Sequence, residues 1–146
     1  MDVAHTEALI KKLFSGIQAS PEAGKVTEEP VPDNAKPIVV IDKDKEQNSN
    51  VVQVMFKHDA TPDSLRSTLM YMISREAQAL GEAMLATRYN EAVQKADCPY
   101  VAASGNDGNY IFAKTKDAFT IGIIPKEGQT EAALTAALVE LSLIHI

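Results

Sequence analysis

The chain has 146 residues, of which 45% are hydrophobic, and its formal net charge is −6 at pH 7. That length fits one domain, or one domain with a piece of another, and the hydrophobic fraction suffices for one core. The acidic residues are spread along the chain and no basic block occurs, which argues against nucleic acid or an anionic membrane as a partner. No apolar run approaches the roughly 20 residues that span a bilayer, and the first five residues do not resemble a signal peptide.

Residues 2–17 have the pattern of a short amphipathic helix. Asp2 is a suitable N-cap, and Glu7 and Lys11 form an i,i+4 pair. Apolar residues line one side, namely Ala8, Leu9, Leu13, Phe14 and Ile17. Four of the seven prolines then fall within residues 18–37, together with several acidic residues. This composition predicts an extended connector and a domain boundary.

A pair of strands is expected next. The run "IVVI" (38–41) is short and β-branched, and "VVQVMFK" (51–57) is long enough for a strand whose Val52, Val54 and Phe56 share one face. The polar stretch 42–50 would be the loop between them. Thr61 and Pro62 predict a helix start.

The helical pattern that follows extends to about residue 95. Its apolar residues recur at steps of three or four: Leu65, Leu69, Ile73, Ala77, Leu80 and Met84, with Leu85, Tyr89 and Val93 beside them. A single helix over 62–95 would be about 50 Å long, so we expect a break near Ser74–Arg75 or Gly81. Pro99 ends the run.

Two strands and a helix complete the pattern. Residues 100–114 and 117–124 read as strands joined by a tight turn over 114–117, and Gly105 and Gly108 suggest a bulge or strand irregularity in the first. Residues 130–141 read as a helix with Leu134, Leu138 and Leu141 on one stripe. The order β-β-α-α-β-β-α predicts an α+β fold, with helices packed on a mainly antiparallel sheet.

Several segments together resemble the insulinase/pitrilysin-type zinc metallopeptidases, in particular bacterial zinc proteases of that family. The segments are "DVAHTEALIKKLFSGI" (2–17), "VPDNAKPIVVIDKDKEQ" (31–47), "VVQVMFKHDATPDSLRSTLMYMI" (51–73), "MLATRYNEAVQKADCPY" (84–100) and "IFAKTKDAFTIGI" (111–123). Members of that family consist of two similar α+β halves that enclose a peptide. Zinc lies in the first half, on a His-x-x-Glu-His helix with a distant glutamate.

The resemblance implies a division of the chain. Residues 1–17 would be the last helix of the preceding half, 18–37 the inter-domain linker, and 38–141 the start of the second, non-zinc half, an incomplete domain. Residues 142–146 would be a tail that does not fit the family pattern. The implied partners are the preceding catalytic half of the same polypeptide and a peptide substrate. The family allows a bacterial periplasm or cell envelope, but the sequence does not fix the compartment.

No zinc motif occurs in the sequence. Its three histidines, His5, His58 and His145, are far apart, whereas hydrolytic zinc needs three protein ligands and a carboxylate that takes the proton of the water. We therefore expect no catalytic, cofactor-binding or metal-binding residue in this chain, with zinc only in the full-length parent. The chain would be part of a zinc-dependent metalloendopeptidase and inactive alone. Two alternatives remain: a non-catalytic relative that serves as a structural or partner subunit, and an independent α+β binding module.

Several motifs suggest chemistry but have simpler interpretations. Arg88, Tyr89 and Glu91 are expected to form a solvated or locally bonded helix face, with the Tyr89 hydroxyl at a polar edge. His58 beside Asp59 is expected to be a turn histidine. The acids of 42–50 lack the glycine and glutamate of a calcium loop. The string "SGNDGN" (104–109) lacks the Lys-Ser/Thr of a phosphate loop. Cys98, the only cysteine, is not expected to be reactive.

Overall fold

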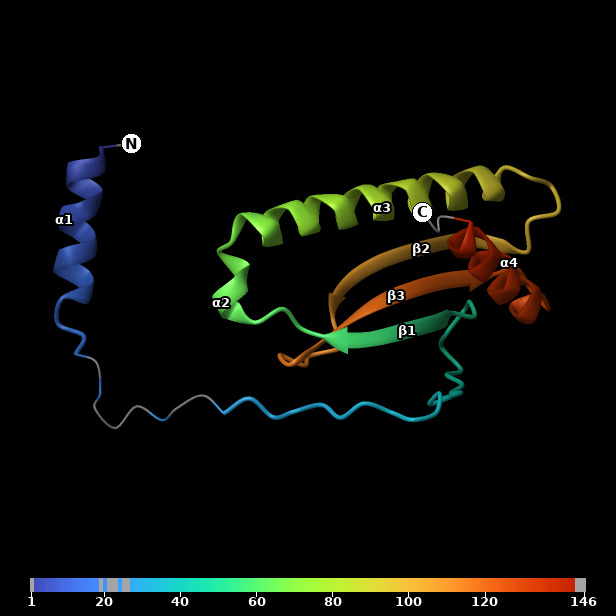
Figure 1. Cartoon of the computed structure of the whole chain (residues 1–146), viewed down its shortest axis with the longest axis horizontal. Coiled ribbons are helices and arrows are strands. Elements are labelled where there is room, and N and C mark those ends of the chain that lie inside the picture. Colours follow the sequence, from blue (N-terminus) through green and yellow to red (C-terminus); the bar gives the residue numbers. More distant parts are fainter. Residues whose placement is uncertain (1, 19, 21–23, 25–26, 144–146) are drawn as a thin grey trace.

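The structure, a computed structural model, describes residues 2–18, 20, 24 and 27–143. Its elements are α1 (Val3–Phe14), β1 (Val52–Asp59), α2 (Asp63–Arg66), α3 (Leu69–Val93), β2 (Tyr100–Asn109), β3 (Lys116–Pro125) and α4 (Thr130–Ser142). The three strands form an antiparallel sheet, and α3 and α4 pack on one side of it (Figure 1). The predicted α+β class is thus confirmed.

The sheet has the order β1-β3-β2, so the last strand in the chain is the central one. Val54 lies opposite Ile121 in one pair of strands, and Gly105 lies opposite Ile121 in the other. The register shifts once, between Tyr100 and Ala102. The irregularity expected in this strand is present, but it lies between Tyr100 and Ala102 and not at Gly105 or Gly108. The turn between β2 and β3 lies over residues 110–115 and not over 114–117, because β2 ends at Asn109, before the expected end at residue 114, and β3 begins at Lys116.

The expected strand at Ile38–Ile41 is not present. These four residues are extended but lie outside the sheet, and their exposed fractions are between 70% and 86%. A β-branched run forms a strand only where a neighbouring strand satisfies its backbone groups, and none lies beside this one among the described residues. The order after α1 is consequently β-α-α-β-β-α. Residues 42–50 are not a hairpin loop.

The long helical pattern breaks earlier than expected, between α2 and α3. Thr68 is the N-cap of α3, and its hydroxyl accepts a hydrogen bond from the Tyr71 amide at 3.2 Å. From there α3 continues without interruption for about 37 Å, so the expected breaks near Ser74–Arg75 and Gly81 are wrong. The strong cap at Thr68 places the interruption, because it satisfies an amide of the new first turn. Helix α2 begins at Asp63 with no side-chain cap.

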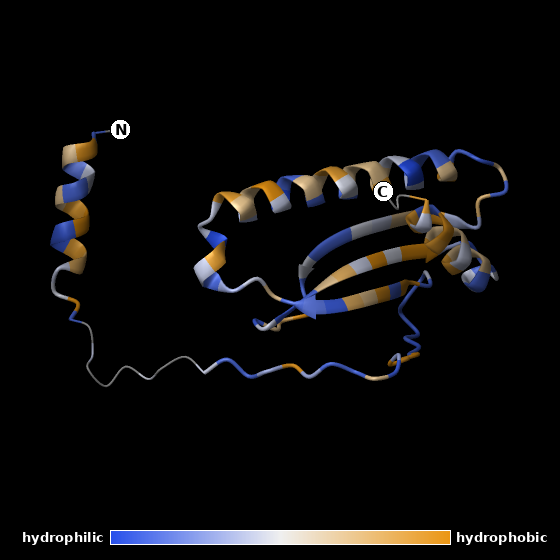
Figure 2. Cartoon of the chain, viewed as in Figure 1, coloured by the Kyte–Doolittle hydropathy of each residue, from blue (hydrophilic) through white to orange (hydrophobic). Residues whose placement is uncertain are grey.

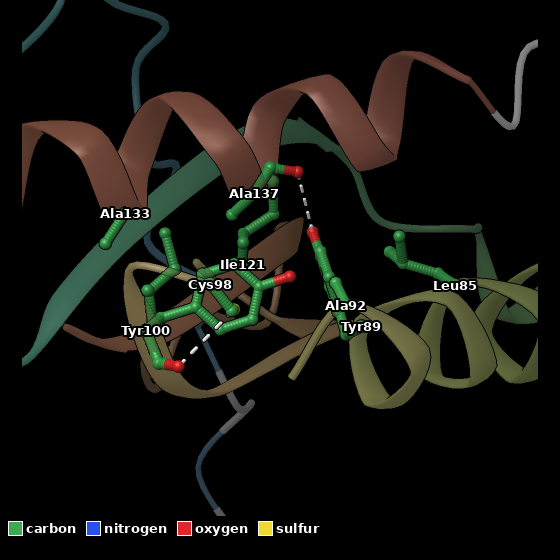
Figure 3. Packing of buried hydrophobic residues seen from close by; sticks show 9 residues of the cluster. Leu85, Tyr89, Ala92, Cys98, Tyr100, Ile121, Ala133 and Ala137 are labelled. Carbon is green, nitrogen blue, oxygen red and sulfur yellow. Dashed lines mark hydrogen bonds between the residues drawn. The ribbon is translucent and has the colours of Figure 1, made fainter. Parts of the chain in front are cut away.

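The core lies where α3, α4 and the sheet meet (Figure 3). The five largest fully buried side chains are Tyr89, Tyr100, Leu85, Ile121 and Ile123. The rings of Tyr89 and Tyr100 meet edge to face, with centroids 6.2 Å apart and an interplanar angle of 85°, an arrangement that aromatic pairs favour. Val52 and Val54 pack against this cluster, as their shared face predicts.

The apolar stripe expected along α3 is mostly not the buried one. Leu69, Ile73, Leu80 and Met84 are exposed, and helix α3 buries Leu85, Tyr89 and Ala92 instead. Figure 2 shows hydrophobic residues on parts of α3 that do not face the sheet. The sheet covers only one face of the helix. Helix α3 has two adjacent apolar stripes, and sequence periodicity alone cannot tell which of them will face the sheet.

Helix α1 is capped as expected but lies apart from the sheet and from the other helices (Figure 1). The Asp2 carboxylate accepts hydrogen bonds from the amides of Ala4 and His5, and Lys11 bonds Glu7 at 2.6 Å. Its apolar residues, among them Leu9, Leu13 and Phe14, are exposed, and so is Ile17 beyond its end. The end of the helix falls at Phe14, with Ser15 as its C-cap.

Two glycines with opposite surroundings give a first test of the packing. A Cβ at Gly105 would lie 2.5 Å from Leu85 Cδ2 and 3.1 Å from Phe119 Cζ, whereas a Cβ at Gly81 would meet nothing within 4 Å. We expect Gly105→Ala to lower the free energy of unfolding by about 1–3 kcal/mol through overpacking. Gly81→Ala, inside α3, should raise it by about 0.5–1 kcal/mol. Urea unfolding measures both, and effects of the same sign would contradict this packing.

The exposed run Ile38–Ile41 gives a second test. Four consecutive apolar side chains in an extended segment favour association between chains. Val40→Thr keeps the β-branched shape and the net charge but removes a hydrophobic methyl group. We expect slower aggregation, measured by light scattering, with an unchanged urea midpoint because Val40 is exposed. A lowered midpoint would mean that Val40 is packed in the native fold.

Candidate functional site

Charged side chains gather at one end of the sheet, where β1 ends and β3 begins. The register places Asp59 opposite Lys116 and His58 opposite Asp117. Figure 2 shows this hydrophilic end of β1 at its arrowhead. Successive side chains of a strand point to opposite faces, so His58 lies on the face that carries the helices and Asp59 on the other. The two faces of this end therefore carry different clusters.

On the helix-bearing face, His58 pairs with Asp107 of β2 across the central strand. His58 Nε2 and Asp107 Oδ1 are 2.7 Å apart, and the other ring nitrogen lies 3.1 Å from the Asp59 carbonyl oxygen. The Asp107 amide donates to the Glu82 carboxylate of α3 at 3.0 Å. The hydrogen bond to Asp107 raises the pKa of His58 above its ordinary value of 6.5. His58 lies within β1 and is not a turn histidine, and its acidic partner is Asp107, not the side chain of Asp59.

On the opposite face, Lys116 is the one buried charged residue in the described part of the chain, with an exposed fraction of 7%. Its ammonium group donates to Asp59 Oδ1 and to Asp33 Oδ1, each at 2.7 Å. These two hydrogen bonds raise the pKa of Lys116, and the bond from Lys116 lowers the pKa of Asp33 below its ordinary value of 3.8. Asp33 belongs to the proline-rich connector, so part of the connector contacts the sheet.

Arg88, Tyr89 and Glu91, which invited a catalytic reading, do not form a common site. Tyr89 is fully buried, and its hydroxyl donates to the Ala137 carbonyl oxygen at 3.2 Å, so the expected polar edge for this hydroxyl is wrong. Burial raises the pKa of Tyr89 to about 12. Arg88 Nη2 donates to Glu140 of α4 at 2.6 Å, which is a contact between helices and not a local one. Glu91 is exposed.

The residues of the remaining motifs make ordinary structural contacts. The carboxylates of Asp42 and Asp44 accept hydrogen bonds from the nearby amides of Lys43 and Glu46, each at 2.8 Å. The string 104–109 is part of the regular strand β2. The buried Cys98 thiol donates to the Tyr100 carbonyl oxygen at 3.5 Å.

An apolar hollow of about 260 Å³ lies near Leu85, Phe119 and Leu141.

The described residues do not fit a zinc centre. His5 lies on α1 and His58 on β1, and His145 is outside the described residues. Within the described part of the chain, no group of three or more His, Cys, Asp or Glu side chains is placed to hold a metal ion. Likewise, none of the helices in the described ranges has both the length and the apolar character that crossing a membrane requires.

Comparison with known proteins identifies the family. A family model described as the peptidase M16 inactive domain matches residues 1–145. The chain belongs to this family. Searches of curated proteins and of solved structures each gave no significant match. The M16 assignment supports the resemblance to the insulinase/pitrilysin group, and the word "inactive" in the description agrees with a half that does not carry the chemistry.

Sequence reasoning missed the residues that make the two clusters of this M16 inactive domain. Asp107, Lys116, Asp33 and Glu82 were not singled out, because the two clusters join residues between 25 and 83 positions apart. The strand register could have indicated the contact between Lys116 and Asp59, since it places the two residues directly opposite each other. No sequence pattern links Asp33 to Lys116.

The His58–Asp107 contact predicts a pH dependence of stability. Because the pKa of His58 is raised in the folded state, the contact stabilises the fold fully below about pH 6.5, the ordinary histidine value. This contribution is lost as the pH rises through the higher folded-state pKa. In the Asp107→Asn variant, the NMR midpoint of His58 should fall toward 6.5, and the loss of unfolding free energy above that pH should shrink.

Asp117→Asn is the matched control for this prediction. Asp117 raises the pKa of His58 only through its charge and is the smallest of the contributions. The variant should therefore lower the NMR midpoint of His58 less than Asp107→Asn does. Equal shifts in the two variants would show that the hydrogen bond to Asp107 is not the cause.

Proposed function

We propose that this chain is the hinge and the non-catalytic half of a zinc-dependent metalloendopeptidase. The observation that carries the proposal is membership of the peptidase M16 inactive-domain family over residues 1–145. In this proposal the catalytic half precedes the chain in the same polypeptide and supplies the zinc. The present chain forms one wall of the peptide chamber and moves relative to the catalytic half.

The packing supports a mechanical role. Helices α3 and α4 are joined to the sheet through one continuous core, and Tyr89 contacts both β2 and α4. A body that closes on a substrate as a unit needs such a core, together with a connecting segment that absorbs backbone rotation. The proline-rich connector before β1 is that segment in our proposal.

The side chains present also argue for a supporting role in the reaction. Three of the polar groups named above have structural partners: His58 pairs with Asp107, Lys116 with two aspartates, and the Tyr89 hydroxyl with a backbone carbonyl oxygen. Arg88 Nε and the Tyr100 hydroxyl are buried without a hydrogen-bond partner. A hydrolytic site would instead present a metal or a nucleophile with a base toward an open position. Peptide hydrolysis is therefore assigned to the preceding half.

The proposal predicts that peptidase activity depends on the preceding half. We expect the 146-residue chain to show no hydrolysis of a quenched fluorescent peptide with added zinc. The polypeptide extended upstream through a His-x-x-Glu-His helix should hydrolyse the peptide and lose this activity with a chelator. Replacing the two motif histidines by alanine in the extended polypeptide is the matched control. Chelator-sensitive hydrolysis by the 146-residue chain alone would overturn the proposal.

The same experiment separates the alternative function. If the upstream coding sequence lacks the motif and the extended polypeptide assembles with an active relative without hydrolysing peptide itself, the chain belongs to a non-catalytic partner subunit. That outcome would remove the peptidase proposal but leave the family assignment intact.

A further inference from the structure

The apolar hollow near Leu85 lies between α3, the central strand β3 and the last turns of α4. Leu85 is 2% exposed and belongs to the core cluster, against which Phe119 and Leu141 pack. Figure 3 shows Leu85 at one end of that cluster, away from Tyr100. The hollow is therefore an opening at the edge of the core. The described residues that line it are Gln78, Gly81, Glu82, Leu85, Phe119 and Leu141.

The floor of the hollow is held in place by the packing on β2. A Cβ at Gly105 would lie 2.5 Å from Leu85 Cδ2 and 3.1 Å from Phe119 Cζ, so these two side chains meet directly above the glycine. The volume of about 260 Å³ exceeds that of an apolar protein cavity of about 150 Å³ that takes up benzene. The hollow thus has room for an apolar group of the size of one aromatic ring.

Gly81 leaves the hollow open on the side of α3. A glycine in the interior of a helix lowers stability by about 0.5–1 kcal/mol relative to alanine. At Gly105 close contacts account for the glycine, whereas a Cβ at Gly81 would meet nothing within 4 Å. Packing therefore does not explain Gly81. Positions that depart from local preference without a packing reason are typical of functional sites, and the missing side chain here leaves space one helical turn before Leu85.

Glu82 places a carboxylate at the rim of the hollow. It is the one charged residue among the described residues that line the hollow. Its Oε1 accepts a hydrogen bond from the Asp107 amide at 3.0 Å, which holds the carboxylate toward the sheet. The two nearby charged groups of opposite sign are bound elsewhere, because His58 pairs with Asp107 and Arg75 donates to Gln78. Within the described part of the chain, Glu82 has no cationic partner.

We propose that this hollow is a binding site for a small organic cation that carries an apolar group of the size of one ring. The apolar group lies against Leu85, Phe119 and Leu141, and the ammonium group donates to the Glu82 carboxylate. A carboxylate held beside an apolar surface favours such a ligand, since it pairs with the charge while the ring leaves water. The proposal goes beyond the proposed function and does not rest on it.

A titration of the 146-residue chain tests the site. The probe is 2-phenylethylammonium, which is protonated at pH 7 as a lysine side chain is. Its neutral counterpart of the same shape is 2-phenylethanol. We expect saturable NMR shifts of the Leu85 and Leu141 methyl groups, and an affinity at least about threefold higher for the cation. The absence of saturable shifts would overturn the proposal, and so would equal affinities for the two probes.

Gly81→Leu and Gly81→Ala form a matched pair that tests the location of the site. The leucine side chain fills the hollow from α3, whereas the alanine methyl group leaves most of its volume free. We expect Gly81→Leu to weaken binding of 2-phenylethylammonium about tenfold or more, and Gly81→Ala to weaken it less. Urea unfolding shows whether each variant is folded. Equal affinities in the two folded variants would place the ligand elsewhere.

Glu82→Gln and Glu76→Gln test the charge, and they decide the matter even if Gly81→Leu does not fold. Both variants remove one negative charge from α3, but Glu76 is exposed and does not line the hollow. Glutamine at position 82 retains an oxygen that accepts from the Asp107 amide. We expect Glu82→Gln to abolish the preference for the cation over 2-phenylethanol and Glu76→Gln to retain it. A preference that survives in Glu82→Gln would overturn the proposal. None of these measurements involves peptidase activity, so failure of this site and failure of the proposed function are distinguishable.

Discussion

The docking of Tyr89 between the sheet and α4 is the interaction on which the rest of the structure depends. This one side chain contacts the Tyr100 ring at the start of β2 and bonds the Ala137 carbonyl oxygen of α4 (Figure 3). One helical turn earlier, Leu85 lies against Gly105 of β2, and a side chain in place of this glycine would collide with it. Together the two residues fix the face of α3 that is buried and the distance of the helix from the sheet. The buried Ile121 and Ile123 of the central strand complete the same cluster.

With the helices fixed on one face, the end of the sheet presents charged residues on both faces. On one face His58 and Asp107 span the central strand next to Glu82 of α3, and on the other Lys116 joins β1 to the connector. Both clusters contain an acid paired with a base from a distant part of the chain. Their contacts hold strand ends and a connector in place, which is a structural use of groups that in other surroundings perform catalysis.

This distribution of polar groups fits the family to which the chain belongs. The chain belongs to the peptidase M16 inactive-domain family, and the polar groups of the two clusters serve as structural contacts within its fold. The connector has both an anchored part and an exposed part within the described residues. Hydrogen bonds from Lys116 and with Thr115 attach residues 29–33 of the connector to the end of the sheet.

The sequence by itself determined the class of fold and the kind of each long element. Helical spacing identified α3 and α4, β-branched residues identified β1 and β3, and Asp2 identified the start of α1, because each of these signals is local. The tertiary structure alone decided that Ile38–Ile41 is not a strand, that α3 buries Leu85 and Tyr89 and not Leu80 and Met84, and that Lys116 binds Asp33. A strand needs a partner, a helix face needs a surface, and an ion pair needs proximity. These conditions depend on residues far apart in the chain, which only the folded packing brings together.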